Sequence, residues 1–208
     1  MSKIKLTKGE LKRQRDALSQ YKRYLPTLQL KKQQLQLEIA GQLNLLSEKE
    51  RLAEKKEEVI QLWAGLLTEN IGGLKEWVSP LNVVRGEKNV AGVSLPVFEK
   101  VDFPEAEYDL FSLPLWVDFA AAALRELVSL KKEIETIEEG VAILRQELRI
   151  TTQRVNLFEK VKIPEAEEAI RLIKIYIGDQ MSNAVGRSKI AKRKIEEYEE
   201  YAEASLAA

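Results

Sequence analysis

A run of mostly apolar residues at alternating spacings of three and four constrains the fold of this chain more than any other feature. It spans ten positions, from Leu127 to Phe158. The positions are Leu127, Leu130, Ile134, Ile137, Val141, Leu144, Leu148, Thr151, Val155 and Phe158. This spacing places all ten side chains along one stripe of an α-helix, and a partner helix must cover such a stripe to shield it from water. The run therefore predicts one helix of a coiled coil.

A second heptad pattern occupies the first third of the chain. Thr7 followed by Glu10 is a capping box, which predicts a helix that begins there. The stripe behind it comprises Leu11, Leu18, Tyr21, Leu25, Leu28, Leu35, Ile39 and Leu46. We interpret the next apolar residues, Leu52, Val59 and Leu66, as the same stripe after one shift of phase.

The segment between about residues 70 and 114 has a different composition. It holds four of the six prolines and four glycines, which favour turns over long helices. Residues 81–85 and 93–97 predict two short strands, with a turn at residues 86–89. The sequence thus predicts a small head that contains a β-hairpin, and Pro96 favours an exposed edge. The candidate partner contacts on this edge are Val93, Leu95 and Val97.

Two prolines fall inside the predicted helices. Pro26 predicts a kink or the start of a new segment, because proline removes one backbone hydrogen bond. Pro164 predicts an interruption, and the acidic residues after it suit the first turn of a new helix. The apolar pattern then resumes at Ile170, Ile173 and Ile177, and continues more weakly through Met181, Ala184, Ala191, Ile195 and Tyr198.

These patterns predict a mainly α fold in three parts. Residues 1–68 form an N-terminal coiled-coil helix, residues 69–115 form the head, and residues 116–208 form a C-terminal coiled-coil helix interrupted near Pro164. An antiparallel pair of helices with the head at one end is the simplest way to cover both stripes. Pairing of each helix with another chain is the alternative, which periodicity leaves open. The candidate seam residues are Leu11, Leu18, Leu25, Leu28, Leu35, Ile134, Ile137, Val141, Leu144 and Leu148.

The composition argues against an enzyme. The chain has no histidine and no cysteine, which removes the usual general base, the commonest metal ligand and thiolate chemistry. No glycine cluster is followed by the Gly-Lys-Ser/Thr pattern of a phosphate loop. We therefore expect no catalytic, cofactor-binding or metal-binding residue. The 33 basic and 33 acidic side chains balance, whereas a dedicated nucleic-acid binder usually carries an excess of positive charge.

Two basic clusters are candidate binding surfaces. They comprise Lys3, Lys5, Lys8, Lys12, Arg13 and Arg15, and Arg187, Lys189, Lys192, Arg193 and Lys194. We favour a protein partner over nucleic acid, because a run of glutamates follows the second cluster and repels phosphates. The sequence also predicts no signal peptide and no membrane-spanning run. The residues by themselves indicate a mechanical or scaffolding protein.

One segment carries a resemblance to a known family. The run Leu-Arg-Ile-Thr-Thr-Gln-Arg-Val-Asn-Leu-Phe-Glu at residues 148–159, followed by Ile-Pro, resembles the signature of the D subunit of V-type ATPases/ATP synthases. Residues 25–35 and 89–96 are similar to the N-terminal helix and the hairpin of that family, in the same order. The signature residues are Thr151, Thr152, Gln153, Arg154, Val155, Asn156, Phe158 and Pro164.

The resemblance implies a function that the composition does not show. It implies the non-catalytic central stalk, or rotor shaft, of a rotary ATPase, whose coiled coil sits inside the ring of A and B subunits. The other end would bind the F subunit and the C subunit of the membrane sector, on the cytoplasmic face of the membrane. The shaft would couple ATP synthesis or hydrolysis to proton or sodium transport. Two other interpretations are a prefoldin-like holdase chaperone, which also has two helices around a hairpin, and a generic coiled-coil scaffold.

Overall fold

The chain falls into two compact units. The computed structural model describes residues 5–68, 73–105 and 113–206, with side chains as far as Glu199. One unit, here called the terminal unit, joins Met1–Leu28 to Gln153–Ala208, and the other, the central unit, is Gln29–Thr152. The long helices cross from one unit into the other.

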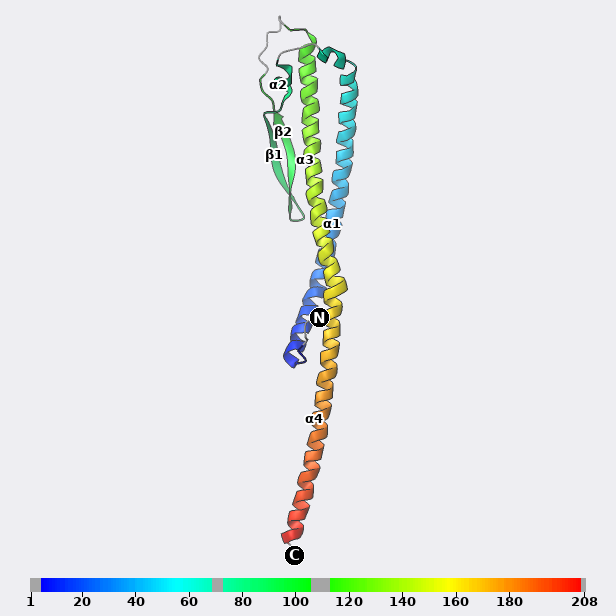
Figure 1. The fold of residues 1–208 in the computed structure, drawn as a ribbon, viewed down its shortest axis with the longest axis vertical. Coiled ribbons are helices and arrows are strands. Elements are labelled where there is room, and N and C mark those ends of the chain that lie inside the picture. Colours follow the sequence, from blue (N-terminus) through cyan, green and yellow to red (C-terminus); the bar gives the residue numbers. More distant parts are fainter. Residues whose placement is uncertain (1–4, 69–72, 106–112, 207–208) are drawn as a thin grey trace. The chain divides into compact units, whose positions relative to one another are not determined.

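The central unit is built on two helices that run in opposite directions. They belong to α1 (Lys8–Gln61), which a short 3-10 helix η1 (Ala64–Thr68) follows, and to α3 (Trp116–Leu157). The described ion pairs between them are Lys31–Glu147 at 2.9 Å, Lys49–Glu133 at 2.7 Å, Glu57–Lys131 at 2.6 Å, and Lys56–Glu126. From Lys31–Glu147 through Lys49–Glu133 to Lys56–Glu126, the residue number rises on α1 and falls on α3, so the pair is antiparallel (Figure 1). The mainly α, antiparallel coiled-coil fold with a hairpin between its helices is thus confirmed.

The stripe that α1 turns toward α3 keeps one phase in the central unit. Its later members, seven residues apart, are Ile39, Leu46, Ala53 and Ile60, all buried or half-buried. Leu52, Val59 and Leu66 lie one position off this stripe and are exposed, so the expected shift of phase is wrong. The true stripe was easy to miss because Ala53 is small, although a coiled-coil seam accepts alanine where the helices meet closely.

The central hairpin has longer strands than the sequence pattern predicted. β1 (Asn82–Val90) and β2 (Val93–Asp102) form a two-stranded antiparallel sheet. The turn between them consists of Ala91 and Gly92, whose φ angles are 51° and 80°. Two positive φ angles define a type I′ turn, whose twist matches that of the paired strands. The turn expected at residues 86–89 is therefore wrong, because that segment belongs to β1.

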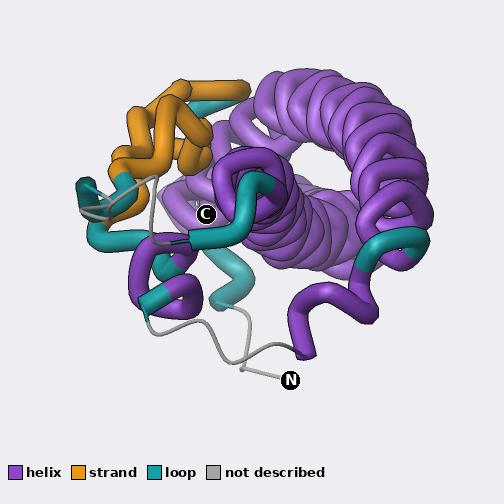
Figure 2. Tube along the Cα trace, turned by 90° about the horizontal axis from the view of Figure 1, so that it is seen from above, coloured by secondary structure: helices purple, strands orange, loops and turns teal. Residues whose placement is uncertain are grey.

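The hairpin lies alongside the two helices and does not sit at their end. Figures 1 and 2 both show the strands beside the helices. Leu95 of β2 is only 4% exposed and shares one buried cluster with Leu35 and Ile39 of α1 and with Leu144 of α3. The expectation of a head at one end of the coiled coil is corrected on this point. A single hairpin is marginal in water, and the apolar face of the helices supplies the cover it needs.

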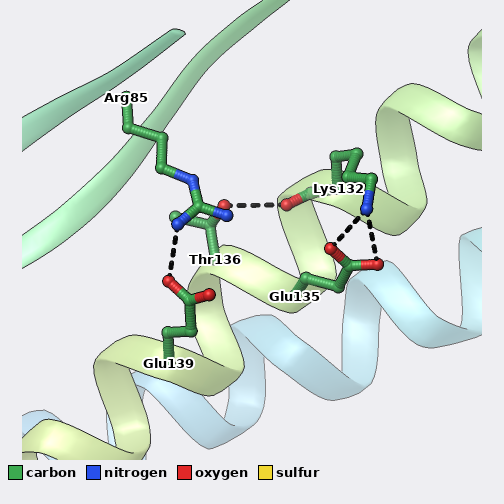
Figure 3. A network of polar contacts seen from close by, with 5 residues as sticks. All are labelled: Arg85, Lys132, Glu135, Thr136 and Glu139. Atoms are coloured by element: carbon green, nitrogen blue, oxygen red, sulfur yellow. Dashed lines mark hydrogen bonds and ion pairs between the residues drawn. The ribbon is translucent and has the colours of Figure 1, made fainter. Parts of the chain in front are cut away.

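An ion pair ties β1 to α3. Arg85 Nη1 lies 2.7 Å from Glu139 Oε2, as Figure 3 shows. Thr136, one turn earlier on α3, is buried and donates its hydroxyl to the Lys132 carbonyl at 2.8 Å. This bond satisfies the threonine hydroxyl within its own helix. A polar residue therefore sits under the hairpin without an unpaired group.

Arg125 fixes the base of the hairpin. Its Nε donates to the Trp77 carbonyl at 3.0 Å and its Nη2 donates to the Pro104 carbonyl at 2.8 Å. Trp77 belongs to the short helix α2 (Leu74–Val78), and Pro104 follows β2. The guanidinium also lies 5.5 Å from the centre of the Phe103 ring. One side chain of α3 thus holds the chain both before and after the hairpin.

The terminal unit pairs the start of α1 with the helices at the C-terminal side. A π-helical turn, η2 (Phe158–Lys162), joins α3 to α4 (Ile163–Leu206). The rings of Tyr21 and Phe158 meet at a centroid distance of 5.3 Å and an angle of 36°. This contact lies between an N-terminal and a C-terminal segment of the same chain, as intramolecular pairing requires.

The two prolines have different local consequences. The helix α1 runs through Pro26 without ending, so no new segment begins there. Pro164 is the second residue of α4, directly after the π turn, and the Ile163 N–H bonds to the Phe158 carbonyl five residues back. The interruption expected near Pro164 therefore takes the form of a wider helical turn, which accommodates a residue that lacks an N–H.

Candidate interaction surfaces

The residues of the family signature divide between two faces of their helix. Thr151 and Val155 are buried, and Thr152 and Phe158 are half-buried. The exposed members are Gln153, Arg154, Asn156 and Pro164. The inward members pack the coiled coil, whereas the outward amide and guanidinium groups are free to form hydrogen bonds with another molecule.

The ten candidate seam residues all lie in the described part of the chain, and none of them is exposed. Leu35, Ile137, Val141 and Leu144 are buried. The half-buried members are Leu11, Leu18, Leu25, Leu28, Ile134 and Leu148. Among these ten residues, Leu35 and Leu144 are 0% exposed, and both belong to the cluster that includes Leu95 of the hairpin.

The second half of α4 is exposed on every side. All side chains of residues 178–199 are exposed, and none of the helices described in this unit covers them. The large apolar side chains on this segment are Met181, Val185, Ile190, Ile195 and Tyr198. A helix with several exposed apolar residues is typical of a segment that a partner covers. We call residues 178–199 the α4 extension.

Charge on the α4 extension is arranged in local pairs. Lys192 Nζ lies 3.4 Å from Glu196, and Arg193 Nε lies 3.3 Å from Glu197. The glutamates therefore neutralise part of the basic cluster within one helix. The first basic cluster begins at Lys3, which lies outside the described residues, and continues along the exposed start of α1. This balance of charge favours a protein partner over a polyanion.

The candidate partner contacts of the hairpin differ in exposure. Leu95 is buried against the helices and Val93 is half-buried. Val97 is 40% exposed. Leu95 is therefore engaged within the chain, which leaves Val97 as the member of the trio that is open to a partner.

Sequence reasoning missed an apolar surface where α1 ends and α3 begins. The exposed large side chains there are Leu62, Leu66, Leu115 and Phe119, and Phe119 is 81% exposed. On the flank of the same helices an open groove is lined in part by Leu52, Val59 and Ala123. The heptad pattern gave no signal for this surface, because it places Leu52, Val59 and Leu66 on the predicted stripe and begins on the later helix only at Leu127. Large apolar side chains outside the seam either stay exposed to water or are covered by a partner.

An exposed ion pair sits on α4 within the terminal unit. Arg171 donates from Nε and Nη2 to the Glu168 carboxylate at 2.9 and 2.6 Å. These hydrogen bonds, together with the charge of Arg171, lower the pKa of Glu168 below its ordinary value. The carboxylate stays charged in mild acid, but at such an exposed site the pair adds little to stability.

The described surfaces carry exposed apolar patches of the kind that binding partners cover. Among residues 5–68, 73–105 and 113–206, no three acidic side chains gather as metal ligands would. No helix in these ranges is both long and apolar enough to span a membrane. Apolar patches on a coiled coil are the surfaces that an assembly covers. The fold and its surfaces thus define a coiled-coil component of a larger complex.

Comparison with known proteins identifies the family. The model of the ATP synthase D subunit family matches residues 10–193. A V-type ATP synthase D subunit of Borreliella burgdorferi is 44% identical over 192 residues, which cover 92% of this chain and 95% of the relative. The protein of the same name from Chlamydia abortus is 37% identical over 205 residues, covering 97% and 98% of the two chains. The chain belongs to the ATP synthase D subunit family.

Membership of this family makes the chain part of a rotary ATPase, a complex of several subunits. A further relative, from Chlamydia trachomatis, carries the same name at 33% identity and covers 96% of this chain. The resemblance seen in the signature segment is confirmed. Membership of the family replaces the two alternative interpretations, a prefoldin-like chaperone and a generic coiled-coil scaffold.

Proposed function

We propose that this chain is the central rotor shaft of a V-type ATP synthase and carries out no chemistry itself. It transmits rotation between the catalytic ring of A and B subunits and the ion-translocating membrane sector. In this role it couples ATP synthesis or hydrolysis to proton or sodium transport, on the cytoplasmic face of the membrane.

The α4 extension is the observation that carries the proposal. Its apolar side chains are exposed and none of the helices of the described terminal unit covers them. Residues 177, 181, 184, 188, 191, 195 and 198 keep the spacing of three and four, so the segment presents one continuous stripe of largely small and apolar side chains. We assign this stripe to the bore of the ring of A and B subunits, whose side chains would cover it. The opposite face is charged and remains solvated.

The apolar surface at the junction of α1 and α3 supports contacts with the other partners. Leu62, Leu115 and Phe119 are largely exposed there, and burying three such side chains stabilises an interface by several kcal/mol, at about 25 cal/mol per Å² of apolar area. We assign this surface to the C subunit of the membrane sector. Val97 and the outer edges of the hairpin are assigned to the F subunit.

The interhelical ion pairs and the anchored hairpin suit the transmission of torque. Four of the described ion pairs link α1 to α3 in the central unit. Arg85 and Arg125 tie the hairpin segment to α3. A shaft must turn as one body along this part, and contacts that fix the register of two helices oppose their sliding past each other.

The proposal is tested by placing a carboxylate on each face of the α4 extension. Ala184→Asp puts the charge on the stripe, and Ser182→Asp puts the same group on the opposite side, two residues away. An unpaired carboxylate buried in an apolar bore costs several kcal/mol, so Ala184→Asp is expected to abolish ATP-driven ion pumping and weaken binding to the A/B ring. Ser182→Asp serves as the matched control and should leave pumping nearly unchanged.

Reconstitution of each variant with the A, B and F subunits and the membrane sector provides the measurement. Binding of the F subunit is scored separately, because its assigned surface lies on the hairpin. Equal pumping by the two variants would contradict insertion of this stripe into the ring. Turnover of ATP by the purified chain alone, surviving repurification, would contradict its non-catalytic role.

A further inference from the structure

Two prolines lie close together along the paired helices in the terminal unit, within about two helical turns. Lys22 of α1 and Glu167 of α4 form an ion pair at 2.7 Å. Pro26 follows Lys22 by four residues and Pro164 precedes Glu167 by three. Because the two helices are antiparallel here, the step from Lys22 to Pro26 and the step from Glu167 back to Pro164 go in the same direction along the pair. Each step covers about one helical turn. Both helices therefore lack a backbone N–H donor in the same short stretch.

The π turn adds a second irregularity to this stretch. The Ile163 N–H reaches the Phe158 carbonyl, a bond over five residues instead of four. The buried positions on this side run from Val155 through half-buried Phe158 to Ala166. Phe158 and Ala166 are eight residues apart, where a regular heptad would space them by seven. The wide turn absorbs the extra residue, so the stripe after it still faces α1.

Few strong contacts compensate for the irregular backbone. The ion pair between Lys22 and Glu167 is more than half exposed on both sides, so solvent screens it. The first two buried side chains after the π turn, Ala166 and Ala169, are small, and the larger Ile170 and Ile173 are buried only further along α4. Thr27 Oγ1 donates to the Tyr24 carbonyl at 2.8 Å, so it does not replace the bond to the Lys22 carbonyl that Pro26 removes. The rings of Tyr21 and Phe158 also meet in this stretch, at a centroid distance of 5.3 Å.

We propose that residues 22–28 of α1 and residues 158–164 of the facing segment form a joint, at which the paired helices bend and twist more readily than elsewhere. We call this stretch the proline joint. Helical kinks occur where backbone bonds are missing or widened, and here both helices have such a place within a few turns of each other. Its use rests on the proposed function: in a rotor shaft, a compliant stretch stores twist between the discrete steps of the ring and the membrane sector.

Amide hydrogen exchange on the full chain tests the joint directly. Local opening sets the exchange rate of a helical amide. Amides of the proline joint are expected to exchange at least about tenfold faster than those of residues 39–46 and 141–148. Replacing both prolines, as Pro26→Ala with Pro164→Ala, gives each helix back its donor and should slow exchange in the joint by about tenfold or more.

Two further variants sharpen the test. Deletion of Lys160 on the Pro26→Ala, Pro164→Ala background removes the extra residue, and should convert the π turn to regular α-helix with the slowest exchange of all. Ser182→Ala is the control for an alanine placed elsewhere in α4, and should leave exchange in the joint unchanged. Exchange in the wild-type joint as slow as in residues 39–46, or unaltered by the two alanines, overturns the proposal.

A second measurement separates the joint from the proposed function. The torsional stiffness of the assembled machine is expected to rise with the two alanines, while binding to the A/B ring is unchanged. If the chain shows a fast-exchanging joint but never binds the ring, the proposed function fails and the joint stands. If it works as a shaft with uniform exchange along α1 and α4, the joint fails and the proposed function stands.

Discussion

Truncating Leu144 to alanine is expected to destabilise the central unit strongly. Leu144 is 0% exposed and touches a cluster built from three elements, with Leu35 and Ile39 on α1 and Leu95 on β2. Removing a buried leucine side chain to its β-carbon costs about 2–5 kcal/mol. We expect the upper part of that range, about 3–5 kcal/mol, because α1 and the hairpin cannot both move in to fill the same space.

Thermal unfolding followed by far-UV circular dichroism measures this loss. In a chain of 208 residues each kcal/mol lowers Tm by about 2–4 °C, so the expected drop is about 6–20 °C. Leu37→Ala is the matched control, since it makes the same chemical change on α1 at a leucine that is 74% exposed. Its effect should stay within about 0.5 kcal/mol.

A double-mutant cycle with Leu95→Ala tests the assignment of the hairpin to this cluster. Leu95 and Leu144 belong to the same buried cluster, and residues in contact show coupling energies of about 0.5–3 kcal/mol. Additive effects of Leu95→Ala and Leu144→Ala, or equal losses for Leu144→Ala and Leu37→Ala, would refute this packing of the hairpin on the helices.

Three further outcomes are expected. Arg125→Lys loses the fork that bonds two carbonyls at the base of the hairpin, so amide exchange in β1 and β2 should rise while that of residues 29–35 does not. Gly92→Ala places a side chain at a φ of 80° and should cost about 1–2 kcal/mol in urea unfolding, whereas Ala91→Gly should be neutral or stabilising. Charge reversal at Lys31 or Glu147 alone should cost at most about 1 kcal/mol, because both side chains are part-exposed. Exchanging the two charges in a double variant should restore the wild-type midpoint of unfolding. A failure to restore it would argue against this pairing of α1 with α3.

The sequence alone determined the fold class and the family. Periodicity is a local property, and ten positions spaced by three and four leave little choice but a paired helix from Leu127 to Phe158. The glycines and prolines likewise placed a hairpin in the middle of the chain. The signature around Thr151 and Asn156 identified the family, because it depends on residue identity and not on contacts.

Only the tertiary structure decided which of two neighbouring stripes on α1 faces α3, and which side chains the hairpin covers. Leu52 and Ala53 are adjacent, and the large side chain is the exposed one, because a register fixed over many turns overrides the local preference to bury the larger group. The turn at Ala91 and Gly92 escaped prediction since alanine rarely adopts a positive φ. The buried state of Leu95 depends on Leu35, Ile39 and Leu144 from distant parts of the chain. No local pattern contains such a contact, because it arises only when α1, α3 and the hairpin meet.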